Sequence, residues 1–116
     1  MVWILFVLMP KEKFEVSKES KEFIRSFEIS ENEVISALDL LFSWVGDVKH
    51  VKVDLIVDYE ELDGKEKSWK NLKVSFCLQD ISISEKTEII NKLSRDFYSL
   101  FPEIPTYFVV ECPRSV

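Results

Sequence analysis

Glycine is scarce in this chain of 116 residues, which contains only Gly46 and Gly64. Loops that cradle phosphate groups need several glycines close together, so both the Walker pattern and the dinucleotide-binding pattern are excluded. Histidine is rarer still, since His50 is the only one. Structural zinc sites use four ligands from paired short motifs of Cys and His, and the sequence has no such motif. We therefore expect neither a cofactor nor a bound metal.

Asparagine and glutamine are also few, whereas lysine and glutamate are abundant, and this balance is typical of heat-adapted proteins. The formal net charge is −6, and the lysines are interleaved with acidic residues throughout the chain. A protein that binds nucleic acid mainly through phosphates needs a basic face, and so does one that binds an anionic membrane. Neither nucleic acid nor a membrane is therefore an expected partner.

Cysteine occurs twice, as Cys77 and Cys112, and nothing in the sequence resembles the disulfide framework of a small secreted protein. The sequence therefore predicts free thiols in a reducing cytoplasm. Residues 2–9 are all apolar, but a membrane span needs about 20 such residues. No basic residues precede them, and Pro10 with charged neighbours follows where a signal peptide has small residues. This segment is predicted to be a buried strand that Pro10 ends.

Residues 17–46 carry the 3.6-residue period of helices. Ser17 is predicted to cap a short first helix. Ser30 and Glu33 have capping-box spacing at the start of a second helix, which Gly46 is expected to end. In this second helix the apolar residues cover an arc of roughly 220°, which is more than one sheet face hides. We expect the preceding helix or another subunit to cover the remainder.

Two alternating apolar segments, residues 51–59 and 72–79, flank Asp63-Gly64, which is a strong signal for a hairpin turn. With this turn, Leu55 is expected opposite Leu72. A shift of two residues would put Val57 there instead and would match the apolar faces equally well. Turn chemistry favours the first register. This register would also set Glu61 opposite Glu66, and facing like charges are destabilising. The strands are therefore expected to stop short of a frayed, charged loop at residues 60–68.

A helix from Ser84 to Pro102 and a strand at residues 107–110 complete the chain. The order of elements predicts a single α+β domain over residues 1–116, with a ferredoxin-like βαββαβ sandwich and an extra helix in the first crossover. The first and third strands would then lie at the centre of the sheet. If residues 1–9 do not join the sheet, the alternative is a three-stranded ββαβ sheet with N-terminal helices.

His50 and Cys77 come closest to a catalytic pattern, because the hairpin register places them side by side and a Cys–His pair is the minimum for nucleophilic catalysis. The sequence identifies no third group that would orient the pair, so an ordinary polar sheet face is the favoured interpretation. His50, Asp54 and Asp58 share one strand face but lack the closed ligand set of a structural metal site. An Asp54–Lys73 pair on a solvated face is the simpler interpretation. We assign no catalytic residue.

The interface residues that the sequence suggests are Trp44, Leu40 and Ala37 on the helix with excess apolar surface. Trp69, which follows the charged loop, is a fourth candidate. Our hypothesis is a non-catalytic cytoplasmic protein-interaction module that forms a homodimer. The alternative is a regulatory domain that binds a small molecule in a groove between subunits or between helix and sheet.

Overall fold

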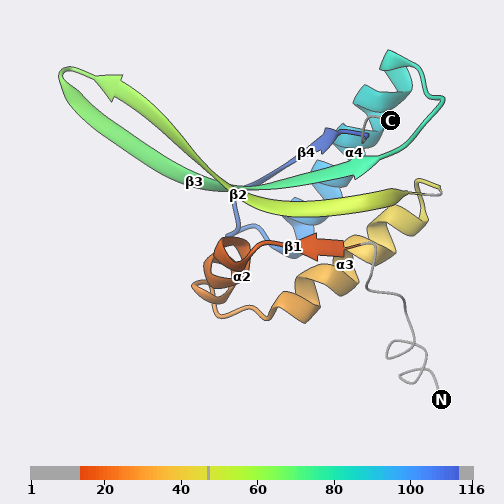
Figure 1. Ribbon diagram of the computed structural model, residues 1–116, viewed down its shortest axis with the longest axis horizontal. Helices are drawn as coiled ribbons and strands as arrows, with labels where there is room; N and C mark the ends of the chain where they lie inside the picture. Colours follow the sequence, from red (N-terminus) through yellow and green to blue (C-terminus); the bar gives the residue numbers. More distant parts are fainter. Residues whose placement is uncertain (1–13, 47, 113–116) are drawn as a thin grey trace.

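The computed structural model describes residues 14–46 and 48–112, so the strand predicted at residues 2–9 lies outside the described residues. The described residues form one mixed sheet and three helices, as Figure 1 shows. The strands are β1 (Phe14–Val16), β2 (Lys49–Leu62), β3 (Lys65–Cys77) and β4 (Thr106–Val110), and the helices are α2 (Lys18–Arg25), α3 (Glu31–Ser43) and α4 (Ile83–Leu100). The α+β class predicted from the sequence is confirmed.

The strands of this sheet lie in the order β1-β2-β3-β4. β2 and β3 are antiparallel, whereas β1 is parallel to β2 and β4 is parallel to β3. The ferredoxin-like arrangement is therefore not confirmed, because each crossover joins neighbouring strands and β2 and β3 occupy the centre. Hydrophobic periods show which face of a strand is buried, but not which strands are neighbours. The three-stranded alternative omits β1, whose three residues are too few to show an alternation.

The helices pack against one face of the sheet and form a single core with it. Aromatic rings meet at its centre, where the ring centroids of Phe42 and Phe76 are 5.1 Å apart. Those of Phe97 and Phe108 are 5.8 Å apart, so that α4 is fixed against β4. The buried apolar residues of this core are Ile24, Val34, Leu38, Leu41, Phe42, Val48, Val51, Val53, Leu72, Val74, Phe76, Leu93, Phe97, Ile104 and Phe108.

Serine side chains cap the three helices. The predicted caps of the first two are confirmed, because Oγ of Ser17 and Oγ of Ser30 each accept a backbone N–H of the first turn. For α4 the predicted start at Ser84 is wrong, since Ser82 is the cap and its Oγ accepts the N–H of Glu85 at 3.1 Å. Ser82 and Glu85 have capping-box spacing, so the sequence did contain the signal for the true start.

The hairpin has the register that the Asp63-Gly64 turn predicts, with Leu55 opposite Leu72. The alternative register, with Val57 opposite Leu72, is wrong. Asp63 and Gly64 have φ angles of 54° and 74°, and two consecutive positive φ angles are the mark of a type I′ turn. This turn has the twist of the strands it joins, so it fixes their pairing from the tip inward.

The strands do not stop short of residues 60–68, and the frayed loop predicted there is wrong. Pairing continues to Leu62 opposite Lys65, beside the turn. Glu61 does face Glu66, but the neighbouring rung brings Glu60 opposite Lys67 and offsets that repulsion. We call residues 57–70 the arm. Figure 1 shows this part of β2 and β3 projecting beyond the helices.

Cys77 and Cys112 form a disulfide, so the prediction of free thiols is wrong. The parallel pairing of β3 with β4 ends at Phe76 opposite Val110, and this brings the two cysteine Cα atoms to 4.5 Å from each other. The pairing of these strands was not evident from the sequence, and the link could not be inferred without it.

Among the helices in the described part of the chain, none is long and apolar enough to cross a membrane.

Candidate interaction surface

The structure brings together two of the four interface residues suggested by the sequence. Leu40 and Trp44 are one helical turn apart at the C-terminal end of α3, and they are 54% and 64% exposed. We call this pair the helix patch. Ala37 is only half-buried on the same helix, and Trp69 lies elsewhere, on β3 within the arm. Figure 1 shows the arm extending away from the end of α3 that carries Trp44, so the four residues do not form one surface.

The wide apolar arc of α3 is divided between the core and the solvent. Its buried side chains are Val34, Ile35, Leu38, Leu41 and Phe42. The apolar surface of α3 that stays exposed is smaller than the sequence suggests, and another side chain of the same chain contacts part of it. Nζ of Lys92 on α4 lies 5.4 Å from the centroid of the Trp44 ring, which is a cation–π distance. The same ammonium group donates to Asp96 at 2.8 Å, so the lysine is held over the ring.

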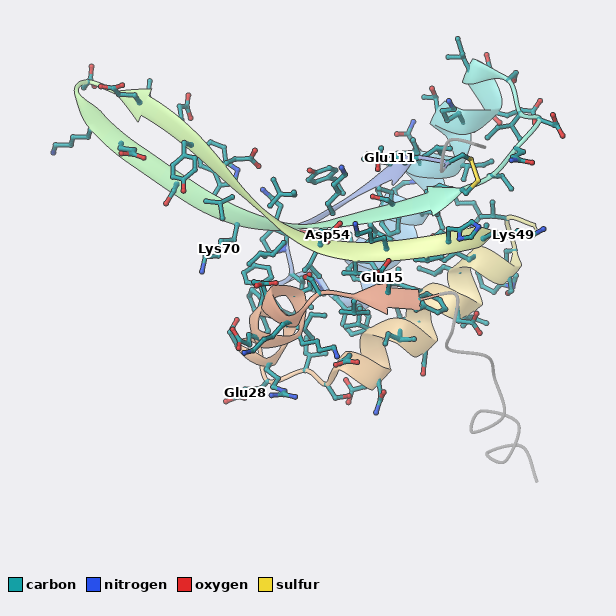
Figure 2. The ribbon with its side chains drawn as sticks, in the orientation of Figure 1. Glu15, Glu28, Lys49, Asp54, Lys70 and Glu111 are labelled. Carbon is teal, nitrogen blue, oxygen red and sulfur yellow. A yellow bond between two sulfur atoms is a disulfide. The ribbon has the colours of Figure 1, made fainter. Side chains whose placement is uncertain are left out.

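The arm is the more exposed of the two surfaces, since all of residues 59–70 are exposed. Its large apolar side chains are Val57, Tyr59, Leu62 and Trp69, which are 38%, 67%, 54% and 44% exposed. At its base, Nδ2 of Asn71 donates to Oδ2 of Asp58 at 3.0 Å. Figure 2 shows the arm side chains spreading into solvent on both faces of the ribbon, among them Lys70.

The two edges of the arm present main-chain groups in a fixed alternation. In a two-residue hairpin the residues that flank the turn bond to each other, and every second residue then points its N–H and C=O outward. On β2 the outward residues therefore have odd numbers, and C=O of Val53 does accept the N–H of Ser17 from outside the hairpin. On β3 the outward residues have even numbers, and the N–H of Leu72 does donate outward to the C=O of Pro105 at 2.8 Å.

The pairing of His50 with Cys77 that the sequence predicts is wrong. The register shifts between Lys49 and Lys52, so Lys49 is the residue opposite Cys77. His50 occupies this irregularity with φ of 53°. Because the Cys77 sulfur is bonded to Cys112, it is not a thiol that could act as a nucleophile. Across the described ranges, no group of three or more His, Cys, Asp and Glu side chains is placed to hold a metal ion.

The face of the sheet away from the helices carries an ion pair that the sequence assigned differently. Asp54 is opposite Lys73 as predicted, but Nζ of Lys73 lies 2.8 Å from Oε1 of Glu111 instead. The hydrogen bond with Lys73 lowers the pKa of the Glu111 carboxyl, and the same bond raises the pKa of the Lys73 ammonium. Oδ2 of Asp54 lies 4.0 Å from Nζ of Lys52, which makes a weak ion pair. These contacts neutralise charge within the face.

A depression of about 350 Å³ lies beside the base of the arm. It is bounded by the C-terminal part of α4, the segment that leads into β4 and Asn71 of β3. Its lining mixes apolar and polar side chains, and includes Phe97, Tyr98 and Glu103. A small molecule held between helix and sheet, as in the alternative hypothesis, would be expected here.

Comparison of the chain with protein-family models, with curated proteins and with solved structures gave no match.

Proposed function

We propose that this protein is a non-catalytic protein-interaction module that self-associates as a homodimer. The observation that supports it most strongly is the arm, whose residues 59–70 are all exposed. A two-stranded ribbon that buries little of its own surface is at best marginally stable in water. Tyr59 and Trp69 nevertheless lie exposed on this ribbon, and aromatic residues are enriched at protein interfaces. A second protein surface over the arm would supply the burial that one copy lacks.

The helix patch supports the same class of function. Leu40 and Trp44 lie at the other end of the molecule from the arm tip, so one chain presents two separate apolar surfaces. Trp is enriched among the residues that dominate binding energy at protein interfaces. The cation–π contact with Lys92 holds the Trp44 ring in place, and an ordered ring loses less entropy on binding.

The charge of the arm favours a protein partner over a nucleic acid. Its acidic residues are Asp58, Glu60, Glu61, Asp63 and Glu66, and its basic residues are Lys65, Lys67 and Lys70, so its net charge is 3 − 5 = −2. A ribbon that binds nucleic acid has to neutralise phosphates with an excess of lysine or arginine. Opposite charges on the two strands of one ribbon suit instead a surface that carries both signs.

We further propose that the protein is located in the cytoplasm of a heat-adapted organism. Disulfides such as Cys77–Cys112 persist in oxidising compartments and are rare in the cytosol, except in hyperthermophiles. The lysine- and glutamate-rich composition, poor in amides, supports that exception. Rapid alkylation of lysed source cells, followed by mass measurement of the chain in each fraction, tests it. A disulfide-bonded chain in the cytosolic fraction supports the proposal, and a chain confined to a secreted or periplasmic fraction contradicts it.

Sedimentation velocity on the full chain, under non-reducing conditions, tests self-association. We expect the sedimentation coefficient to rise with concentration between about 1 and 200 μM, from the value of a monomer to that of a dimer. This range brackets the affinities of small interfaces. A concentration-independent monomer up to 200 μM would contradict the proposal.

A further inference from the structure

We infer that the second copy binds along the free edge of β3, with the two β3 strands antiparallel and the twofold axis at Ser68. The inference rests on the proposed self-association and assigns its surface and register. We call residues 65–71 of β3 the free edge.

The length of the free edge is set by its neighbours on the same side of β3. The turn at Gly64 begins it, and β4 covers β3 from Leu72 onward, with Leu72 opposite Thr106. Between these limits lie residues 65–71, which makes 71 − 65 + 1 = 7 residues. Within the described part of the chain, no strand pairs with this stretch on the side away from β2. Ser68 is its central residue.

The main-chain groups of the free edge fit such a pairing. Its outward N–H and C=O groups belong to Glu66, Ser68 and Lys70, because the even positions of β3 point away from β2. In an antiparallel pair, outward residues of one strand must face outward residues of the other. A twofold axis at Ser68 meets this condition, because it places Ser68 opposite the partner's Ser68 and the even residues on either side opposite one another.

The side chains of the free edge are complementary about Ser68. On one face, Glu66 comes opposite the partner's Lys70, and Lys70 comes opposite the partner's Glu66. Opposite charges in directly facing cross-strand positions are stabilising. On the other face, Lys67 comes opposite the partner's Trp69, within reach of a cation–π contact, for which Trp offers the best ring. The symmetry makes each of these contacts occur twice.

Other pairings of the arm bring like groups together or exceed the free edge. An axis at Lys67 would face that lysine with its own copy, and an axis at Trp69 would require Leu72, which β4 already covers. The outer edge of β2 is acidic, so an axis at Tyr59 would set Asp58 against the partner's Glu60 on both sides. Facing like charges are destabilising, and this charge is what protects the β2 edge from pairing.

The tip of the partner's arm then reaches the depression at the base of this one. Asn71, the last residue of the free edge, lines that depression, and in the proposed register it faces the partner's Lys65. Glu103 lines the same depression and carries the opposite charge to the partner's Lys65. The site offered as a small-molecule groove therefore serves, in this register, to receive the partner's turn.

A charge exchange on the free edge tests this register. Glu66→Lys and Lys70→Glu each convert two facing pairs of opposite charge into like-charged pairs, so each should raise the dimer Kd by at least about tenfold. The double variant E66K/K70E restores opposite charges in both pairs, and its Kd should return to within about threefold of the native value. Sedimentation velocity at several concentrations measures all four proteins, and melting curves confirm that they are folded.

A pair of proline variants tests the edge itself. Ser68 and Tyr59 face each other across the hairpin, and each directs its N–H to an opposite outer edge of the arm. Ser68→Pro removes an N–H that the dimer needs, whereas Tyr59→Pro removes the matched N–H on the β2 edge. We expect S68P to be a monomer at concentrations where the native protein and Y59P are dimers.

The outcomes separate this inference from the proposed function. If the native chain dimerises while E66K and K70E leave Kd unchanged, or the double variant stays as weak as either single one, the register is wrong and self-association stands. In that case Leu40→Ser with Trp44→Ser, which removes the helix patch, identifies the alternative surface. A native chain that stays monomeric overturns both. Should S68P fail to fold, the charge exchange alone decides.

Discussion

The Sγ atoms of Cys77 and Cys112 are bonded to each other, so the last residue of β3 is joined to the segment that follows β4. The two cysteines are 35 residues apart, and the closed loop contains the whole of α4. A link across a loop of this length reduces the entropy of the unfolded chain by an amount worth about 4 kcal/mol at 25 °C. It also adds a covalent link between two parallel strands, which backbone pairing, the packing of Phe108 and the Lys73–Glu111 ion pair otherwise hold together.

Cys112→Ser is expected to lower the free energy of unfolding by about 3–4 kcal/mol. Cys112 is exposed, so serine leaves no cavity there, and the loss reports the link itself. Urea unfolding of the native and variant proteins measures the difference. A reducing agent should lower the stability of the native protein by a similar amount and leave C112S unchanged. Equal stability of the two proteins without reductant would show that the disulfide contributes nothing.

Gly64→Ala is expected to destabilise the arm without changing the melting temperature of the core. Gly64 has φ of 74°, a conformation that costs alanine about 1 kcal/mol, although no atom lies where its Cβ would be. Because the arm opens locally, hydrogen exchange of amides in residues 57–70 should become about fivefold faster. Asp63→Asn is the matched control, since asparagine tolerates the φ of 54° at that position. Unchanged exchange in G64A would contradict a type I′ turn.

The predictable part of the fold is the part that local chemistry determines. Asp63-Gly64 and the alternation on either side were sufficient for the turn and the register, because a type I′ turn permits only one pairing. Sequence reasoning missed β1 because three residues show no period, and missed the strand order because periodicity carries no information about neighbours. The disulfide was missed for the same reason, since it follows from β3 and β4 lying side by side.

The candidate interaction surface was predicted only in part. An apolar arc too wide for one sheet face pointed correctly to exposed Leu40 and Trp44. The arm was missed because the repulsion between Glu61 and Glu66 predicts strands that end before the turn. A two-residue turn instead requires pairing up to its flanking residues, so Asp63-Gly64 already contained the signal for a full-length ribbon. One like-charged rung costs less than the pairing that the turn enforces.

Leu38→Ala and Leu40→Ala are expected to differ strongly in stability, although only one residue separates them in the sequence of α3. Leu38 is fully buried, so its truncation should cost about 2–5 kcal/mol through lost burial and the cavity that remains. Leu40 is 54% exposed, and its truncation should change stability by no more than about 0.5 kcal/mol. Denaturant unfolding at protein concentrations below the dimer Kd compares the two variants directly. A large loss in L40A under those conditions would show that α3 is rotated relative to the described packing.

Glu111→Gln is expected to remove a small contribution to stability that depends on pH. The hydrogen bond with Lys73 lowers the pKa of Glu111, so the contribution is complete above the carboxyl's unfolded pKa of about 4 and is lost as pH falls through the lower folded value. The same bond raises the pKa of Lys73, so the contribution is also lost as pH rises through a folded value above about 10. The side chains of Lys73 and Glu111 are 25% and 52% exposed, and solvent screening limits the pair to about 0.5 kcal/mol.

Urea unfolding measures this contribution. The free energies of unfolding of the native protein and E111Q should therefore differ by a constant small amount between about pH 6 and 9 and converge at pH 3. A difference that grows on acidification would have the wrong sign for a depressed carboxyl pKa.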